Sequence, residues 1–233
     1  MTAGRLTSAR ALLLSGTGRY ADPWHPFAQT SAALAALLQE GGFEVETADD
    51  VDAALAGLGT HAAWPDLLAV NVGLPRDGGT SPGTAAAARG LEAWVSGGRP
   101  ILASHVSSTS FVDSPAWEDA LGGRWVRGTS MHPEYGTAHI LVDPGSGALA
   151  AGIPDFELSD ERYSWLRVNP SVSVHARHRH DGALHPVAWS HVRGGARTFY
   201  DALGHDAPSF ESPEHRELLR RGIAWLAGGI TAA

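Results

Sequence analysis

The sequence predicts an α/β protein in which helices cover both faces of a mostly parallel sheet. Three observations lead to this fold class. The N-terminal half alternates short apolar segments with segments of helical periodicity, which is typical of βαβ units. The apolar segments are hydrophobic at almost every position, as in parallel strands buried on both faces. The chain has 233 residues, of which 43% are hydrophobic and 18% charged, so it can bury a substantial globular core.

Each element of the N-terminal half has a local signal. Strands are predicted where apolar residues run together or alternate, at Ala11–Gly16, Phe43–Thr47, Asp66–Val72 and Arg99–Ala103. Helices are predicted at Phe27–Glu40, at Val51–Leu58, and from Ser81-Pro82 to the residues before Gly97. Glycine pairs end the first and third helices, because glycine readily adopts the conformation of a helix C-cap. Pro82 suits the first turn of the third helix, where its missing N–H costs nothing.

The C-terminal half predicts shorter strands and one last helix. The strands are predicted at Gly123–Val126, Ala138–Val142, Val172–Val174, Pro186–His191 and Arg197–Ala202. Arg193–Ala196 is expected to form a hairpin turn between the last two. The last helix begins at Ser212-Pro213 and ends at Gly228-Gly229. No domain boundary is visible, so we expect residues 1–233 to form one domain, with residues 1–9 as a flexible N-terminal extension.

Charge and hydropathy limit the partners. The formal net charge is −8 and no basic run occurs, which argues against nucleic-acid binding. No apolar run reaches the roughly 18 residues that span a bilayer, and the first residues lack a secretory signal pattern. The chain contains no Cys, which excludes disulfides and thiol chemistry. We therefore expect a cytoplasmic protein that binds a small polar molecule and has no membrane partner; a homo-oligomer stays open.

The loops at the carboxyl ends of the parallel strands are the expected ligand site. Three of these ends carry polar loops, at Gly16–His25, Asn71–Gly73 and Ser104-His105. His105 follows a buried strand directly, at the kind of turn where many α/β enzymes display a nucleophilic Ser or Cys. An imidazole at this position predicts chemistry other than acyl transfer.

Several further residues are candidates for chemistry. Histidines fall in loops or at strand ends at His25, His105, His132, His191 and His205. Asp160 and Glu161 form an acidic pair that could act as general acid and base. Trp189 and His191 lie on one face of a predicted strand, where an aromatic ring beside an imidazole suits a sugar; a core Trp is the alternative. The segment from His175 to His180 has no metal-binding frame and is expected to be an exposed loop.

The ordered set of these segments resembles the ThuA family, named for trehalose utilisation. The matching stretches are Gly97 to His105, Trp117 with Leu121 to Gly123, His132-Pro133, Phe156 with Asp160-Glu161 and Tyr163, Pro186 to His191, Arg197 to His205, and Gly222 to Gly228. The resemblance implies a flavodoxin-like three-layer sandwich of the class I glutamine-amidotransferase type. The sequence departs from the family pattern at Ala103, where a Gly is usual, and at Gly194 to Ala196, where a Gly-Lys-Gly turn is usual.

The resemblance also implies one shared pocket. Its catalytic residues would be His105, His132, Asp160, Glu161, His191 and His205. His25, Trp189 and Tyr163 are expected to bind the substrate, and no metal ligand is assigned.

Three functions are compatible with such a pocket. The first is a hydrolase, lyase or isomerase that acts on a disaccharide or keto-sugar by His and carboxylate acid–base chemistry, without a cofactor. The second is a hydrolase in which three of the five histidines and a carboxylate hold Zn²⁺. The third is a carbohydrate-binding protein without activity. Glutamine amidotransfer is excluded, because it needs a thiolate that this chain lacks.

Overall fold

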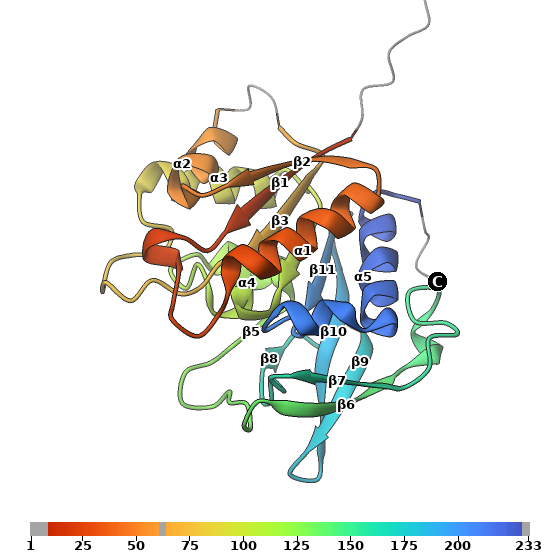
Figure 1. The fold of residues 1–233 in the computed structure, drawn as a ribbon. Helices are drawn as coiled ribbons and strands as arrows, with labels where there is room; N and C mark the ends of the chain where they lie inside the picture. The colour runs from red at the N-terminus through yellow and green to blue at the C-terminus, as the bar shows by residue number, and fades with distance from the viewer. Residues whose placement is uncertain (1–8, 61–63, 230–233) are drawn as a thin grey trace, which may run out of the picture.

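The computed structural model describes residues 9–60 and 64–229 and is built around one nine-stranded sheet (Figure 1). The strands that form it are β1 (Ala9–Ser15), β2 (Phe43–Ala48), β3 (Leu67–Asn71), β4 (Ile101–Ser104), β6 (Gly136–Val142), β7 (Phe156–Asp160), β9 (Ser173–His180), β10 (Ala183–Arg193) and β11 (Ala196–Asp201). Of the predicted N-terminal extension, residues 1–8 lie outside the described residues, and Ala9 begins β1.

The sheet has a parallel half and an antiparallel half. Its strand order is β2-β1-β3-β4-β11-β10-β9-β6-β7. Neighbouring strands from β2 to β11 pair in parallel, and the remaining pairs are antiparallel. β3 is buried at all five positions, which explains why its sequence is an unbroken apolar run ending in Asn71. The predicted α/β class with a mostly parallel centre is confirmed.

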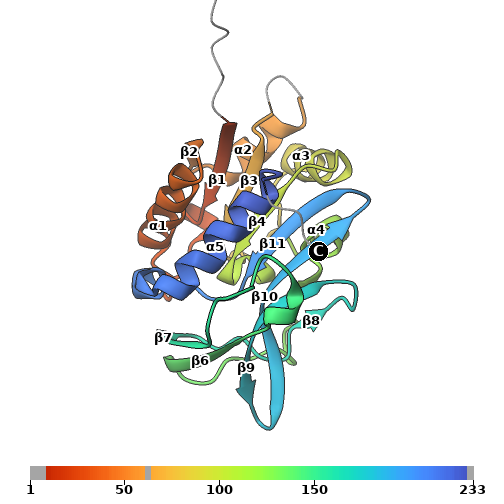
Figure 2. The same cartoon turned by 90° about the vertical axis from the view of Figure 1, so that its right-hand side faces the viewer.

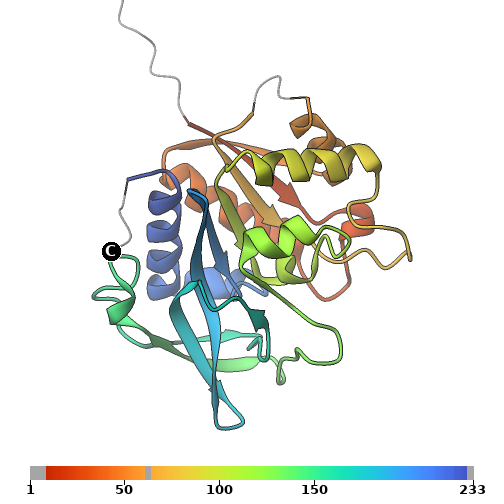
Figure 3. The ribbon, with the colours of Figure 1, turned by 180° about the vertical axis from the view of Figure 1, so that it is seen from behind.

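Helices cover both faces of the sheet (Figures 2 and 3). α1 (Phe27–Glu40) and α5 (Pro213–Leu226) pack on one face. α2 (Val51–Leu58), α3 (Ala85–Ser96) and α4 (Pro115–Leu121) lie on the other. Trp94 on α3 and Trp225 on α5 are fully buried, so each face contributes large side chains to the core. Within the described residues, no helix is long and apolar enough to cross a membrane.

The helix predicted to begin at Ser81-Pro82 begins instead at Ala85. Thr84 caps it, since its hydroxyl accepts a hydrogen bond from the Ala87 amide at 3.0 Å. The hydroxyl of Ser81 accepts from the Phe111 amide at 3.2 Å, which holds this residue in the preceding loop. Both Ser81 and Thr84 are residue types that favour a helix N-cap, and tertiary contacts determine that Thr84 caps α3.

The predicted exposed loop around His175 to His180 is wrong, because these residues form β9. β9 pairs with β10 on one side and β6 on the other. His175 and His178 point inward and are buried, with hydroxyl partners on Ser190 and Ser164. The strand is longer than predicted, because buried hydroxyl and carbonyl partners allow polar histidines on an inward face.

The strand predicted at Gly123–Val126 is shorter than expected. β5 (Gly123–Arg124) pairs only with β8 (Arg167–Val168) in a separate two-stranded sheet. The predicted hairpin turn after Arg193 is confirmed, since it joins β10 to β11.

Candidate active site

Four loops meet at one edge of the sheet and bring three histidines and a glutamate together. The loop after β1 supplies His25, the turn after β4 supplies His105, Glu161 follows β7, and His205 follows β11. The pairing directions make these four strands run the same way, so their carboxyl ends share an edge. Residues up to 180 positions apart in the sequence therefore lie close together. This agrees with the rule that ligands of open α/β sheets bind at the carboxyl ends of the strands.

The side chains of this His–Glu cluster (His25, His105, Glu161 and His205) converge closely. One nitrogen from each ring and one carboxylate oxygen all lie within 4.8 Å of one another. The Glu161 Oε2 atom is 3.3 Å from Nε2 of His105, 3.3 Å from Nδ1 of His205 and 4.0 Å from Nε2 of His25. Those three ring nitrogens are buried, and beyond these contacts with Glu161 they have no hydrogen-bond partner among the described residues.

Asp22 fixes the orientation of the His25 ring. Both carboxylate oxygens lie 2.8 Å from Nδ1, and one also accepts the His25 backbone amide at 3.0 Å. Burial alone would raise the pKa of Asp22, but the hydrogen bond and charge of His25 lower it. The carboxylate is therefore ionised and can only accept, so Nδ1 carries the proton. Burial lowers the pKa of His25 more than Asp22 raises it, so the ring is neutral near pH 7 and Nε2 presents a lone pair.

His105 occupies a tight turn. It begins a short 3₁₀ helix at His105–Thr109 directly after β4, and its φ of 43° lies in the left-handed region. Residues other than glycine seldom adopt this conformation, because it strains the backbone. Strained residues of this kind are often found at functional sites. Nδ1 donates to the Ala202 carbonyl at 2.7 Å, and the His105 carbonyl accepts from the Tyr200 hydroxyl at 2.8 Å. A carbonyl only accepts, so Nε2 is left to face Glu161.

Asp160 lies behind the cluster and positions His205. Its fully buried carboxylate accepts from the amides of Glu161 at 2.7 Å, Gly204 at 2.8 Å and His205 at 3.2 Å. Burial raises the pKa of Asp160, and the charge of His105 and hydrogen bonds from the Ser209 hydroxyl and the Gly204 amide oppose that rise. Gly204 is required at the turn, because its φ is +97° and a Cβ would lie 2.8 Å from the Phe210 ring. The acidic pair is thus split: Glu161 faces the ligand site, and Asp160 holds the backbone.

The electrostatics of Glu161 depend on its histidine neighbours. Burial alone would raise the pKa of Glu161, but hydrogen bonds and charge from His105 and His205 lower it well below its ordinary range. Burial would likewise lower the pKa of His205, yet the hydrogen bond and charge of Glu161 raise it. Glu161 is therefore an anion in a site that favours a cation beside it.

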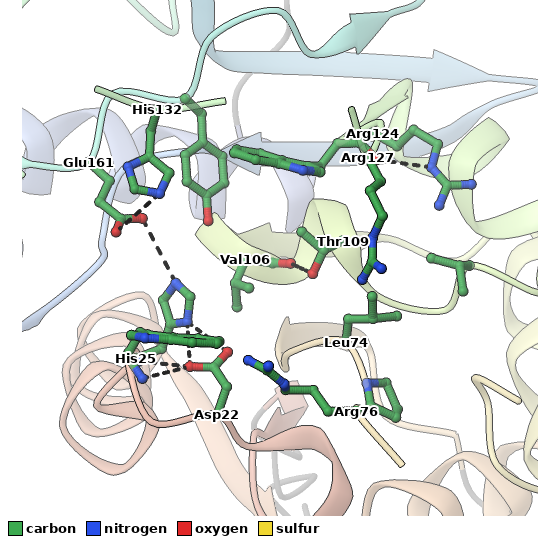
Figure 4. Close-up of a pocket in the computed structure, with 15 residues that line it drawn as sticks. Asp22, His25, Leu74, Arg76, Val106, Thr109, Arg124, Arg127, His132 and Glu161 are labelled. Atoms are coloured by element: carbon green, nitrogen blue, oxygen red, sulfur yellow. Dashed lines mark hydrogen bonds and ion pairs between the residues drawn. The ribbon is translucent and has the colours of Figure 1, made fainter. Parts of the chain in front are cut away.

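The cluster opens into a cavity of about 760 Å³ (Figure 4). His132 lies at its rim, with Nε2 3.5 Å from Glu161 Oε1 and Nδ1 2.9 Å from the Pro133 carbonyl. The Tyr163 ring lies 4.3 Å from the His105 ring between centroids and lines the same wall. Burial raises the pKa of Tyr163 well above its ordinary value, so its hydroxyl stays protonated and can donate a hydrogen bond to a ligand.

Trp189 and His191, two predicted site residues, lie away from both the His–Glu cluster and this cavity. Trp189 and His191 do share a face of β10, but that face packs against the end of α4. Trp189 is fully buried and donates to the Leu121 carbonyl at 2.8 Å. The His191 ring lies beside the Ala120 carbonyl and the Ser171 hydroxyl. His191 pairs with Thr198, toward the start of β11, and Trp189 is enclosed against α4, so neither reaches the site.

The sequence reading missed several residues that line the cavity. They are Asp22, Trp24, Leu74, Arg76, Thr109, Trp125 and Arg127. Asp22 had a local signal, since a carboxylate three residues before a loop histidine can reach its ring. Arg76 follows the strand end at Asn71–Gly73, which is one of the predicted ligand loops. Arg127 and Trp125 had no such signal, because only the fold brings the segment after β5 to this edge.

One family model matches most of the chain. The family model described as ThuA, trehalose utilisation, matches residues 10–226. No curated protein sequence matches the chain.

Solved structures give a similar result for the fold. A ThuA-like protein from Parabacteroides merdae ATCC 43184 has a TM-score of 0.76 at 16% identity, over 97% of this chain and 93% of its own. A ThuA-like protein from Bacteroides uniformis ATCC 8492 has a TM-score of 0.72 at 16% identity, over 97% and 95%. The cytoplasmic protein STM1381 from Salmonella typhimurium LT2 has a TM-score of 0.61 at 10% identity, over 95% and 100%.

Proposed function

The chain belongs to the ThuA (trehalose utilisation) family, and on that premise we propose that it is a sugar-processing enzyme with a divalent metal ion held by the His–Glu cluster. The residues fit such an ion. Three imidazoles and one carboxylate form the donor set typical of Zn²⁺ and related divalent ions in proteins. The reaction would be a hydrolysis, elimination or isomerisation of a disaccharide or keto-sugar.

One observation carries the metal proposal: the ring orientations of His25 and His105. Each ring gives its Nδ1 proton to an acceptor outside the cluster, Asp22 in one case and the Ala202 carbonyl in the other. Because Nδ1 of each ring has this outside acceptor, the Nε2 atoms of both rings face the Glu161 carboxylate, at 4.0 and 3.3 Å, and the three groups together could hold one cation. Outer partners that fix a ring in this way are the usual support of histidine metal ligands.

The remaining residues have separate roles in this proposal. A bound divalent ion supplies Lewis-acid chemistry, which polarises an oxygen of the substrate. His132 at the rim would move the proton, because its Nδ1 faces a carbonyl and its Nε2 faces the cavity beside Glu161. Tyr163 would donate a hydrogen bond to a substrate hydroxyl or carbonyl. Trp24 and Trp125 offer ring faces on which a sugar could stack.

A metal-free site is the second candidate, and the raised pKa of His205 favours it. In that case a protonated His205 would form an ion pair with Glu161, and the two would exchange protons with the substrate directly. The two candidates differ in a single measurable quantity, the metal content of the protein.

The deciding experiment is elemental analysis of the purified protein after reconstitution with Zn²⁺, Mn²⁺ or Co²⁺. We expect about one ion per chain in the wild type and much less in Glu161→Gln and His205→Gln. Glu157→Gln and His139→Gln are matched controls, since both side chains are exposed on neighbouring strands. Turnover of disaccharides and keto-sugars should then follow metal content and stop on chelation. A protein that holds no stoichiometric ion in any of these conditions, and yet turns a sugar over, contradicts the metal proposal.

A further inference from the structure

Two arginines reach into the cavity from separate parts of the chain. Arg76 follows β3, and Arg127 follows β5, and both line the cavity that contains His25 and Glu161. Figure 4 shows their guanidinium ends directed into the open space between the two walls, with the labelled histidines and Glu161 on one side and Arg127 on the other. Both side chains are exposed at the mouth of the cavity, and they come from segments about 50 residues apart in the sequence.

Neither guanidinium is neutralised by this chain. In the part of the chain that the structure describes, Arg76 and Arg127 form no ion pair. Asp77, next to Arg76 in the sequence, pairs with Arg19 at 2.9 Å, and Glu118, near Arg127, pairs with Arg167 at 2.7 Å. A third lining arginine, Arg124, lies 3.5 Å from the same Glu118 and is therefore partly neutralised.

The acids of the cavity are engaged as well. Asp22 and Glu161 are the acidic side chains among its lining residues, and each faces a histidine of the cluster. Arg76 is also oriented, because its guanidinium lies 4.4 Å from the centroid of the half-exposed Trp24 ring. The far side of the cavity therefore offers positive charge that is not paired with an acid among the lining residues.

We infer that the substrate carries an anionic group, a carboxylate or a phosphate, which Arg76 and Arg127 bind while its reacting part lies at the His–Glu cluster. The inference rests on the proposed function, because it assigns the reacting end of the ligand to that cluster. The planar guanidinium forms paired hydrogen bonds with both kinds of anion, and neutral hydroxyl groups give it no such match. The substrate class is thus an acidic or phosphorylated sugar in preference to a neutral one.

Calorimetric titration of the metal-loaded protein with three probes tests the inference. The probes are glucuronate, glucose 6-phosphate and neutral glucose. We expect at least one anionic probe to bind about tenfold or more tightly than glucose, and the stronger of the two identifies the anion as carboxylate or phosphate. Arg76→Gln and Arg127→Gln should each weaken that binding by about tenfold, since a charge-assisted hydrogen bond is lost. Arg89→Gln, an exposed arginine on α3, is the matched control and should bind like the wild type.

Three results would overturn the inference: no binding of either anionic probe at millimolar concentration, equal binding of glucose, or unchanged binding in both cavity variants. In the last case the anion would be bound by the metal ion, and chelation would abolish its binding. Metal content is measured on the same samples. A protein that never holds an ion but binds anions through its arginines contradicts the metal proposal alone. A metal-loaded protein that is indifferent to ligand charge contradicts this inference alone.

Discussion

Asp22 shows how a carboxylate outside the His–Glu cluster can determine which nitrogen of a cluster histidine is available to a ligand. Its oxygens hold the proton on Nδ1 of His25 and so turn Nε2 toward Glu161. The Ala202 carbonyl does the same for His105 with a backbone atom. Two rings of the cluster are therefore oriented by hydrogen bonds from outside it, and the orientation determines which nitrogen is available to a ligand.

Substitution of Asp22 tests this positioning role. Asp22→Asn keeps the shape of the side chain but removes the charge that holds the Nδ1 proton. We expect the affinity for the metal ion to fall by about 10- to 100-fold, while the fold is retained. Competition with a chromophoric chelator measures the affinity, and circular dichroism checks the fold.

Asp119→Asn is the control, because Asp119 is exposed on α4, where it pairs with Arg193. Equal metal affinity in Asp22→Asn and wild type would remove Asp22 from the account of the site.

At the scale of elements, β9 shows what a polar strand needs in order to be buried. His175 is fully buried between the hydroxyls of Ser146 and Ser190, each 2.8 Å from a ring nitrogen. Burial lowers the pKa of His175 to about 4, with the charge of Asp143 opposing the shift and that of Arg177 adding to it. A neutral ring with two hydroxyl partners satisfies its polar atoms without a charge.

Because His175 on β9 is buried as a neutral ring, we expect the folded protein to lose stability in acid. The folded pKa of His175 lies below the ordinary 6.5, so the unfolded chain binds more protons between these two values. The contribution is present above pH 6.5 and is lost as pH falls toward 4. The loss of this contribution between pH 7 and pH 5 should lower the free energy of unfolding by about 2 kcal/mol.

Urea unfolding at the two pH values measures this loss in the wild type and in His175→Gln. The variant cannot be protonated and should lose about 2 kcal/mol less than the wild type over this range. His139→Gln, on the exposed face of β6, should behave like the wild type. An equal pH response in all three proteins would show that His175 does not titrate as its burial requires.

At the scale of the whole molecule, the His–Glu cluster joins parts of the chain that are remote in sequence. His25 and His105 belong to the parallel half of the sheet, whereas Glu161 follows β7 at the far edge of the antiparallel half. An ion bound by all four residues would therefore link the two halves of the fold across the end of the sheet.

Metal binding should stabilise the folded protein for this reason. A ligand that binds only the folded state at about 100 times its Kd adds about 2.7 kcal/mol to the free energy of unfolding. For a chain of this length we expect Zn²⁺ to raise the Tm by about 5–10 °C over the chelated protein. Calorimetry of wild type and Glu161→Gln measures the effect, which should be much smaller in the variant. A Tm independent of the metal in both proteins would contradict a link between the two halves.

Local sequence patterns were sufficient to predict most strands and helices of the parallel half of the sheet. Buried runs such as Leu67–Asn71 and glycine-terminated helices such as Phe27–Glu40 carry their own signals, because a strand buried on both faces must be apolar throughout. The edge position of His25 and His105 followed from the same alternation, together with the rule that ligands meet the carboxyl ends of parallel strands. The same reasoning did not locate Trp189 and His191 correctly relative to the site. A two-residue periodicity shows which residues share a face of a strand, but not which face meets the ligand.

The alternation of apolar segments and the absence of Cys determined, without any coordinates, the α/β class and the exclusion of thiol chemistry. The sequence order of the motifs also indicated the family. Only the tertiary structure decided that Glu161 faces the cluster while Asp160 turns inward, and that Arg76 and Arg127 share its cavity. The physical reason is that periodicity reports burial, which is a property of each element. The convergence of side chains depends on the direction and spacing of strands that lie far apart in the chain.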